Sequence, residues 1–172
     1  MRMEPIIITG FMGSGKTTVA RALARLLNCR ATDLDQVITE REKRSPKEII
    51  EQDGEPAFRE VETRWLRAVL DLNYAGVIAL GGGAWTLQRN RDLITECNGF
   101  SVWLDAPFDL CWQRIVATGN ERPLAPNEEQ AKRLYLARGL QYELASLHLV
   151  AGEGKGVDAL AAAIAQAIQK PG

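Results

Sequence analysis

The sequence is poor in cysteine and histidine. It contains three cysteines and one histidine among 172 residues. Cys29, Cys97 and Cys111 are widely spaced and odd in number, and no CxxC pair or histidine-rich segment accompanies them. This arrangement does not suit a disulfide framework and is typical of reduced thiols in a cytosolic protein. We therefore expect three buried, unpaired cysteines.

An excess of charge and a long apolar run are also absent. Lys and Arg number 21 and Asp and Glu number 22, so the formal net charge is −1, with the two signs mixed along the chain. No basic surface for nucleic acid or an anionic membrane is predicted. No apolar run approaches the length of a bilayer crossing, and no signal-peptide pattern precedes the first predicted strand. We expect a cytoplasmic monomer that acts on a small molecule, with neither nucleic acid nor membrane as a partner.

Short apolar runs alternate with helical patterns along the chain. Apolar residues make up 46% of the sequence, which is enough for one domain across residues 1–172. The predicted strands span residues 5–9, 30–34, 76–80, 100–105 and 146–150. Strands that alternate with helices pair in parallel through right-handed crossovers. The sequence thus predicts an α/β three-layer sandwich with a five-stranded parallel sheet, whose ligands bind at the carboxyl ends of the strands.

The first predicted strand is followed by GFMGSGKTT, residues 10–18. Gly10, Gly15, Lys16 and Thr17 match G-x-x-x-x-G-K-[ST] between a strand and a helix, which is the setting of a P-loop. Glycines let backbone N–H groups turn toward phosphate oxygens, and the positive helix N-terminus adds to their field. We expect ATP here, with Lys16 at the β- and γ-phosphates and Thr17 on Mg²⁺. The predicted ATP contacts of this loop are Gly13, Ser14, Gly15, Lys16, Thr17 and Thr18.

Three classes of P-loop protein compete: GTPases, remodelling ATPases and small-molecule kinases. The chain contains neither the N-K-x-D element nor the D-x-x-G switch of a GTPase. A remodelling ATPase normally ends a strand with an acidic pair, whereas residues 76–80 run directly into three glycines. The polar, weakly periodic segment 118–130 is typical of a mobile loop, and we place a lid at about 118–128. A lid that excludes water favours a kinase.

Two carboxylates follow the second predicted strand, in Asp33-Leu34-Asp35. Alternation along an extended segment would place both on the same side. One carboxylate can then hold Mg²⁺ through water while the other accepts the proton of an attacking hydroxyl. Alternatively, Asp35 only caps the helix that begins with QVITEREK.

The segment GEPAFREVETRWL predicts a helix on which Arg59 and Glu62 are i, i+3 neighbours. A pair of this kind is usually a surface ion pair of small energy. Beside a cleft, Glu62 would instead hold the Arg59 guanidinium in place for a substrate carboxylate. The sequence leaves both interpretations open.

Six segments occur together in one order: GFMGSGKTT, DLD, GEPAFREVE, LGGGA, ERPLA and RGLQY. At these intervals they resemble the shikimate kinase family over nearly the whole chain. The resemblance implies a P-loop NTPase fold with a mobile lid. It also implies transfer of the γ-phosphoryl group of MgATP to the 3-hydroxyl of shikimate, on the path to aromatic amino acids.

The resemblance assigns an acceptor site. It implies that Asp35 contacts the acceptor hydroxyls and that Arg59 and Arg138 grip the acceptor carboxylate. An acceptor with one carboxylate and several hydroxyls needs cationic groups at one end and an acidic residue at the other, which agrees with this assignment. The implied acceptor-binding residues are Asp35, Arg59, Gly81, Gly82, Gly83 and Arg138.

The resemblance also assigns a nucleotide site. It implies that Asp33 lies near the metal with Thr17, that Arg114 lies against adenine, and that Arg122 comes from the lid to neutralise phosphate charge. A mobile loop arginine suits that last role. Lys155 is a candidate contact to the base. The implied catalytic residues are Lys16, Asp35 and Arg122.

A few features depart from the family pattern or have another interpretation. Ala125 follows R-P-L where the family usually has Leu, and residues 151–156 form a glycine-rich version of the adenine-side loop. Asp105 could be an acidic strand-end residue, although a helix-start role is favoured. Trp85, after the glycines, is a candidate wall of the acceptor site. The alternative functions are a kinase of another polyhydroxy acid, such as gluconate, and a silent relative that only binds nucleotide or a protein partner.

Overall fold

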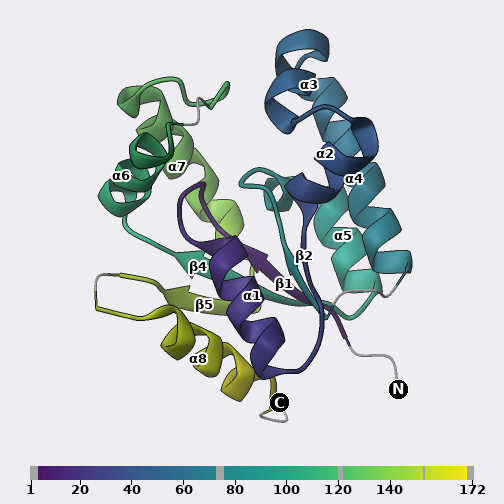
Figure 1. Ribbon diagram of the computed structural model, residues 1–172, viewed down its shortest axis with the longest axis vertical. Coiled ribbons are helices and arrows are strands. Elements are labelled where there is room, and N and C mark those ends of the chain that lie inside the picture. Colours follow the sequence, from purple (N-terminus) through teal and green to yellow (C-terminus); the bar gives the residue numbers. More distant parts are fainter. Residues whose placement is uncertain (1–3, 73–75, 120–121, 153, 170–172) are drawn as a thin grey trace.

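A computed structural model of the protein describes residues 4–72, 76–119, 122–152 and 154–169. Within these ranges the chain alternates between strands and helices, as the sequence predicts (Figure 1). The elements are β1 (Ile6–Thr9), α1 (Lys16–Leu26), β2 (Ala31–Asp33), α2 (Leu34–Glu42), α3 (Pro46–Asp53), α4 (Glu55–Asp71), β3 (Val77–Ala79), the 3₁₀ turn η1 (Ala84–Thr86), α5 (Gln88–Glu96), β4 (Phe100–Asp105), α6 (Phe108–Thr118), α7 (Glu128–Tyr142), β5 (Leu147–Val150) and α8 (Val157–Gln169).

The five predicted strands form one sheet with the order β2-β3-β1-β4-β5. Every pairing is parallel, and the central strand β1 places Ile7 between Ile78 of β3 and Ser101 of β4. The parallel five-stranded sheet is therefore confirmed. Strand β4 has the predicted bounds, and the other four are shorter than predicted by one or two residues.

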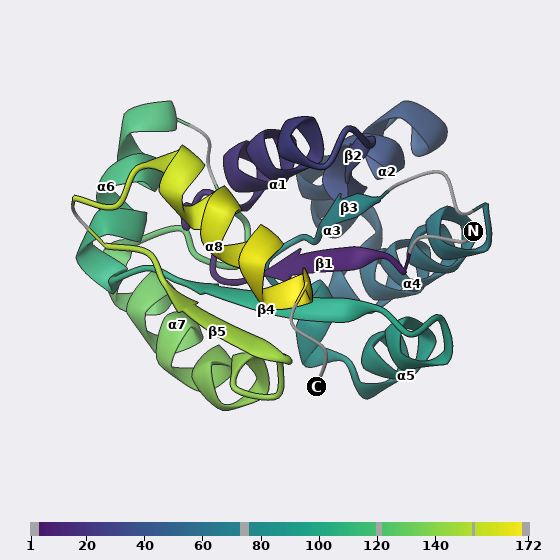
Figure 2. The ribbon, with the colours of Figure 1, turned by 90° about the horizontal axis from the view of Figure 1, so that it is seen from below.

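Helices cover both faces of the sheet, which gives the three predicted layers (Figure 2). Helices α1 and α8 pack together on one face, and α4, α5 and α7 cover the other. Because the central strand of such a sheet is covered on both faces, it is rich in apolar residues, and Ile6, Ile7 and Ile8 of β1 are all buried. None of the helices within the described ranges combines the length and apolar character of a bilayer crossing.

The cysteines differ in burial. Cys111 on α6 is buried in the core, whereas Cys29 and Cys97 are only half-buried, and all three are free thiols. The prediction of three buried cysteines is therefore wrong for two of them. Both half-buried cysteines lie just beyond the end of a helix, where the chain turns through a loop near solvent.

The topology brings three loops to one edge of the sheet. The loops after β1, β2 and β3 leave the carboxyl ends of neighbouring strands, because β1 and β2 both pair with β3. Helices α2, α3 and α4 rise on one side of this edge, and α6 and α7 rise on the other (Figure 1). The three loops carry the P-loop motif, the Asp33-Leu34-Asp35 segment and the triple glycine.

Candidate active site

A cleft of about 520 Å³ lies at this edge of the sheet. Its lining includes the P-loop, both predicted aspartates and the three glycines at the end of β3. Helix α4 contributes Arg59 and Glu62, α7 contributes Arg138, and α6 with the segment after it contributes Arg114 and Arg122. Segments distant in the sequence thus meet in one cavity.

The P-loop connects β1 directly to α1. Gly15 occupies the N-cap position of α1 with φ of 97°, a conformation that only glycine adopts readily. Lys16, the first residue of α1, folds back so that Nζ donates a hydrogen bond of 2.8 Å to the carbonyl oxygen of Phe11. Burial lowers the pKa of Lys16 to about 8, although the nearby Asp35 carboxylate opposes this shift. The P-loop therefore holds the Lys16 cation at the N-terminus of α1.

Thr17 and Asp33 form an oxygen pair beside Lys16. The Thr17 hydroxyl donates a hydrogen bond of 2.5 Å to Asp33 Oδ2. The other carboxylate oxygen of Asp33 accepts hydrogen bonds from the backbone N–H groups of Asp35 and Gln36, so Asp33 is the N-cap of α2. The expected extended alternation through Asp35 is wrong, because β2 ends at Asp33 and Asp35 lies in the first helical turn. The capping role belongs to Asp33, not to Asp35 as the alternative interpretation had it.

Asp35 is free of capping contacts and faces the glycine loop. Its Oδ1 atom is buried and has no hydrogen-bond partner in the described part of the chain. A Cβ atom on Gly81 would lie 2.7 Å from this oxygen. Burial raises the pKa of Asp35, Asp33 adds to the rise, and Lys16 and Arg122 oppose it. A carboxylate with a raised pKa is a better proton acceptor than an ordinary one.

Arg59 and Glu62 form a buried ion pair on α4. Arg59 Nη1 lies 2.8 Å from Glu62 Oε2, and the two side chains are 10% and 1% exposed. The surface-pair interpretation is therefore wrong. Glu55 also accepts from the Arg59 guanidinium at 3.0 Å. Burial raises the pKa of Glu62 to about 7 against the opposing effect of Arg59, and Glu62 Oε1 is buried without a partner among the described residues.

Arg138 lies on the other side of the glycine loop. It is 6% exposed, and it forms no ion pair with any residue in the described ranges. A Cβ atom on Gly82 would lie 3.2 Å from Arg138 Nη1, and one on Gly83 would overlap the Arg59 guanidinium. Burial lowers the pKa of Arg138, and the Arg59 charge adds to the effect. The glycines thus let two guanidinium groups pack directly against the loop backbone.

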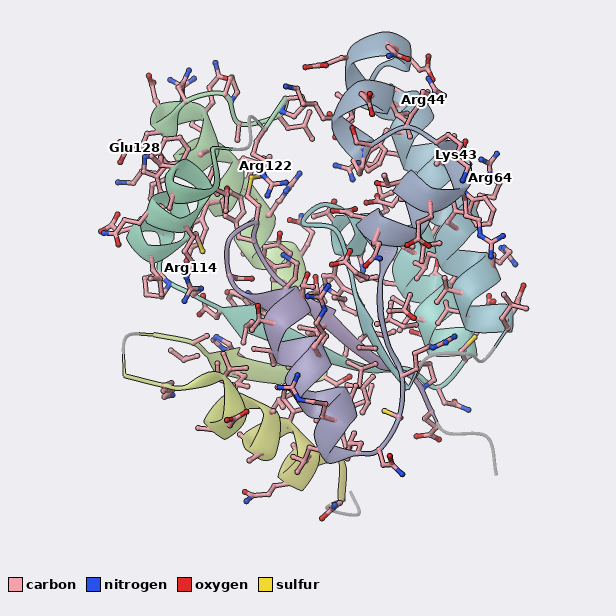
Figure 3. All side chains as sticks on the ribbon, in the orientation of Figure 1. Lys43, Arg44, Arg64, Arg114, Arg122 and Glu128 are labelled. Atoms are coloured by element: carbon pink, nitrogen blue, oxygen red, sulfur yellow. The ribbon has the colours of Figure 1, made fainter. Side chains whose placement is uncertain are left out.

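Arg114 and Arg122 come from the opposite side of the cleft. Figure 3 shows both on the α6 side of the molecule, away from Lys43 and Arg44 near α2 and α3. Arg114 Nη1 donates a hydrogen bond of 3.0 Å to the carbonyl oxygen of Gly13 in the P-loop. Arg122 lines the cleft, and its Nε atom is buried without a partner in the described chain.

The predicted lid falls partly outside the structure. Its residues 120 and 121 lie outside the described residues. Residues 122–127 connect to α7, and they include Ala125, which is 2% exposed. The small side chain after R-P-L is therefore buried, and the mobility of this segment stays a prediction.

Three predicted residues do not line the cleft. Ser14, within the P-loop, is buried, and Lys155 is exposed and donates a hydrogen bond of 3.1 Å to the Val150 carbonyl oxygen. Trp85 is 4% exposed and belongs to the hydrophobic core, so it is not a wall of this cavity. Their roles in binding ATP, for Ser14 and Lys155, stay predictions.

Asp105 does not begin a helix. Helix α6 starts at Phe108 after Pro107, because proline presets the backbone for a helix start without needing a side-chain cap. Asp105 Oδ2 instead lies 2.8 Å from His148 Nε2 on the neighbouring strand β5. The helix-start prediction for Asp105 is therefore wrong.

Several cleft residues were not identified from the sequence. Met12, Ile50 and Phe58 supply apolar surface, and Ile50 and Phe58 lie on α3 and α4 near the acidic residues. Phe58 precedes Arg59, whose guanidinium carbon lies 5.2 Å from the phenyl ring centroid. In the sequence these residues are recognisable only as apolar positions beside a charged motif. Residues of the hydrophobic core show the same pattern, so it does not identify a cleft residue.

The cleft combines cationic groups with a carboxylate. A glycine-rich loop, Lys16 and two arginines provide cationic groups on the P-loop side. Asp35, whose Oδ1 atom is buried, faces Gly81 and lies near the Lys16 and Arg122 charges, while Arg138 and Arg59 pack against Gly82 and Gly83. Such a site can hold a polyphosphate beside a small anionic molecule that carries hydroxyl groups.

Comparisons with known proteins agree with this geometry. A model of the shikimate kinase family matches residues 12–169. A shikimate kinase of Cereibacter sphaeroides is 39% identical over 168 residues, which cover 96% of this chain and 82% of the relative. A solved shikimate kinase from Acinetobacter baumannii, in complex with shikimate, superposes with a TM-score of 0.87 at 34% identity and covers 96% of this chain and 93% of its own. A gluconokinase from Sinorhizobium meliloti, with a TM-score of 0.60 at 18% identity and coverage of 98% and 97%, shares only the fold. The chain belongs to the shikimate kinase family.

Proposed function

We propose that this protein transfers the γ-phosphoryl group of ATP to the 3-hydroxyl of shikimate and releases ADP and 3-phosphoshikimate. The observation that carries the proposal is Arg138, a buried cation without an ion pair in the described chain, which lines the same cleft as the half-buried Asp35 carboxylate. A buried charge of this kind calls for a ligand of opposite sign. Shikimate offers a carboxylate and hydroxyl groups on a small ring, which match the two residues.

On the nucleotide side, the P-loop N–H groups and Lys16 would hold the β- and γ-phosphates. Lys16 has a pKa of about 8, so it is mostly protonated at neutral pH and carries the charge that phosphate binding needs. Arg122 would add a second positive charge from the segment after α6, since its buried Nε lacks a protein partner among the described residues. Arg114, tied to the Gly13 carbonyl oxygen, would lie beside the base.

The residues present fit Mg²⁺ as the metal. Thr17 and Asp33 place a hydroxyl and a carboxylate in contact at the cleft, and Mg²⁺ prefers oxygen ligands. Within the described ranges no three Asp, Glu, His or Cys side chains gather as a complete metal cage. A kinase site does not need one, because Mg²⁺ keeps waters and binds substrate phosphates. When bound, Mg²⁺ would neutralise charge that develops on the phosphates.

On the acceptor side, Arg138 and Arg59 would bind the carboxylate. Glu62 holds Arg59 Nη1, and Glu55 holds its Nη2, so this guanidinium is fixed before the acceptor arrives. Arg138 forms no ion pair among the described residues and would supply the unneutralised charge. The backbone of Gly81, Gly82 and Gly83 would lie against the ring, because no side chain separates it from the cleft.

In the transfer step, the acceptor oxygen forms a bond to the γ-phosphorus while the bond from that phosphorus to the bridging oxygen of ADP breaks. The proton of the acceptor hydroxyl passes to Asp35, whose raised pKa favours the protonated form. Positioning matters more than full deprotonation, because the transition state of phosphoryl transfer is loose. Lys16 and Arg122 would stabilise charge on the transferred group.

We also propose a single domain with a lid at about 118–128, acting as a cytoplasmic monomer. The cleft lining within the described ranges already includes the P-loop, the two acceptor arginines and Asp35, so the proposed reaction does not call for a residue of a second subunit. Closure of the lid would exclude water, which would otherwise accept the phosphoryl group.

A coupled assay of ADP release tests the function. Turnover is measured with shikimate, quinate and gluconate against the background with ATP alone. We expect shikimate to give the highest kcat/KM, because its carboxylate and 3-hydroxyl match the two ends of the acceptor site. Rates equal to the ATP-only background with shikimate would overturn the proposed acceptor, and a higher kcat/KM for gluconate would favour the other polyhydroxy acid.

A further inference from the structure

The C-terminal turn of α7 is attached to the glycine loop by two hydrogen bonds. The Tyr142 hydroxyl donates to the carbonyl oxygen of Gly82. Trp85 Nε1, in the η1 turn that follows the loop, donates a hydrogen bond of 2.8 Å to the carbonyl oxygen of Gln141. In the first bond α7 supplies the donor, and in the second it supplies the acceptor. The two partners on α7 are adjacent residues, and the other two, Gly82 and Trp85, belong to one short segment. They fix the loop relative to the helix.

Helix α7 is also the element that carries Arg138. Arg138 and Tyr142 are four residues apart, so their side chains lie on the same face of the helix. A Cβ atom on Gly82 would lie 3.2 Å from Arg138 Nη1. The residue whose carbonyl oxygen accepts from Tyr142 is therefore the residue against which Arg138 packs.

The surroundings of Tyr142 favour a fixed hydroxyl over a chemical one. Tyr142 is 2% exposed, and its ring stacks with Trp103 at a centroid distance of 6.0 Å. Burial raises the pKa of Tyr142 to about 12, and the nearby Arg138 guanidinium opposes the rise. The hydroxyl thus stays protonated at neutral pH and acts as a hydrogen-bond donor, without gaining or losing a proton in the reaction.

Gly82 lies between two other glycines that are also in close contact with residues of the cleft. On one side Gly81 packs against Asp35, and on the other Gly83 packs against the Arg59 guanidinium. A shift of Gly82 by a fraction of an ångström would change the separation between the proton acceptor and the two guanidinium groups. No side chain on the loop itself can resist that shift, so the resistance comes from residues outside it.

We propose that Tyr142, supported by Trp85, is a positioning residue of the acceptor site that sets the distance between Arg138 and the Gly81–Gly83 loop. The inference rests on the proposed function, because it assigns the acceptor carboxylate to Arg138. Tyr142 acts through Arg138 and Gly82 and does not itself reach the cleft, since it is absent from the cleft lining.

Tyr142→Phe tests the proposal, with Tyr135→Phe as the matched control. Both tyrosines lie on α7, but the Tyr135 hydroxyl donates to the Ala106 carbonyl oxygen at 3.1 Å, away from the glycine loop. We expect Tyr142→Phe to raise KM for shikimate about five- to tenfold, the range of one lost hydrogen bond. KM for ATP should stay within about twofold of wild type in both variants, and Tyr135→Phe should leave KM for shikimate unchanged.

A double variant asks whether Tyr142 acts through Arg138. If it does, Tyr142→Phe should change the dissociation constant of shikimate, measured by calorimetry, much less in an Arg138→Leu background than in wild type. Equal changes in both backgrounds would overturn the proposed route. Identical KM values for Tyr142→Phe and Tyr135→Phe would overturn the positioning role itself.

Two further measurements keep the outcomes distinct. Trp85→Phe removes the second hydrogen bond, and we expect it to raise KM for shikimate in the same direction, so the proposal is testable even if Tyr142→Phe unfolds. Wild type is assayed first with shikimate, quinate and gluconate. Failure of shikimate alone overturns the proposed function, and the Tyr142 comparison is then made on whichever carboxylate acceptor is phosphorylated. If none of the three binds or reacts, both proposals fail.

Discussion

Arg59 and Arg138 should respond differently to removal, although both would bind the same carboxylate. Arg59 is neutralised by Glu62 at 2.8 Å and by Glu55 at 3.0 Å, whereas Arg138 has no ion pair among the described residues. Replacing either arginine by Leu removes a partner of the acceptor carboxylate. We expect each change to weaken acceptor binding by roughly 2–4 kcal/mol, or about 30- to 700-fold, and to leave the ATP affinity nearly unchanged.

The two substitutions should change the free energy of unfolding by different amounts. Arg59→Leu leaves the 1% exposed Glu62 side chain without its cation, and breaking a buried pair costs roughly 3–5 kcal/mol. Arg138→Leu removes a buried cation whose burial is itself unfavourable, so we expect the free energy of unfolding to stay within about 1 kcal/mol of wild type. The Arg59→Leu deficit should shrink as the pH falls through about 7, because the Glu62 carboxyl, whose pKa is about 7, then takes up a proton and no longer needs a cation.

Urea unfolding and calorimetry with shikimate measure the two effects. The matched control is Arg133→Leu, which lies on α7 but pairs with Glu129 at the surface. It should change neither stability nor binding by more than about 0.5 kcal/mol. Equal losses of stability for Arg59→Leu and Arg138→Leu would refute the charge argument, and equal losses of ATP and acceptor affinity would refute the carboxylate site.

Three further predictions concern titratable groups in the cleft. Asp35→Asn should lower kcat by about 100-fold or more at every Mg²⁺ concentration, whereas Asp33→Asn should be partly rescued by added Mg²⁺; a magnesium series of kcat separates them, and rescue of Asp35→Asn would reverse the roles. The pKa of Lys16 is about 8, so kcat/KM for ATP should fall above that pH as the charge is lost, and a flat profile would remove Lys16 from phosphate binding. Glu62 has its pKa raised from 4.5 to about 7, so the folded state binds the proton more tightly and this stabilisation is lost as pH rises through that window. The loss is about 3 kcal/mol, and urea unfolding across this range should show a smaller decline for Glu62→Gln than for wild type.

The fold followed from local patterns in the sequence. Apolar strand runs with helical segments between them indicated a parallel sheet, because parallel strands need a crossover connection, which is usually a helix. The P-loop was predictable for the same reason, since its chemistry is carried by consecutive residues between β1 and α1. These features depend on neighbours in the sequence, and the structure agrees with them.

The fine structure of the acceptor site did not follow in this way. The positions of Asp33 and Asp35 depend on where β2 ends, and the cap formed by Asp33 ends it one residue before the end of the predicted strand 30–34. The burial of the Arg59–Glu62 pair depends on the glycine loop, which comes about 20 residues later in the sequence. The hydrogen bond from Tyr142 to Gly82 spans 60 residues, and no periodic pattern announces a contact of that kind.

The pKa shifts of four titratable groups in the cleft have the same main cause, which is burial. Burial lowers the pKa of Lys16 and Arg138 and raises the pKa of Asp35 and Glu62, so each group is pushed toward its neutral form. A protein that needed these residues only for stability would gain by replacing them with apolar side chains of similar size. Their presence is explained if phosphate, carboxylate and hydroxyl groups of the ligands supply the missing partners. The free energy that the free protein loses by burying these charges is then regained when the ligands bind. We therefore expect the site to prefer ligands that bring a phosphate and a carboxylate group together.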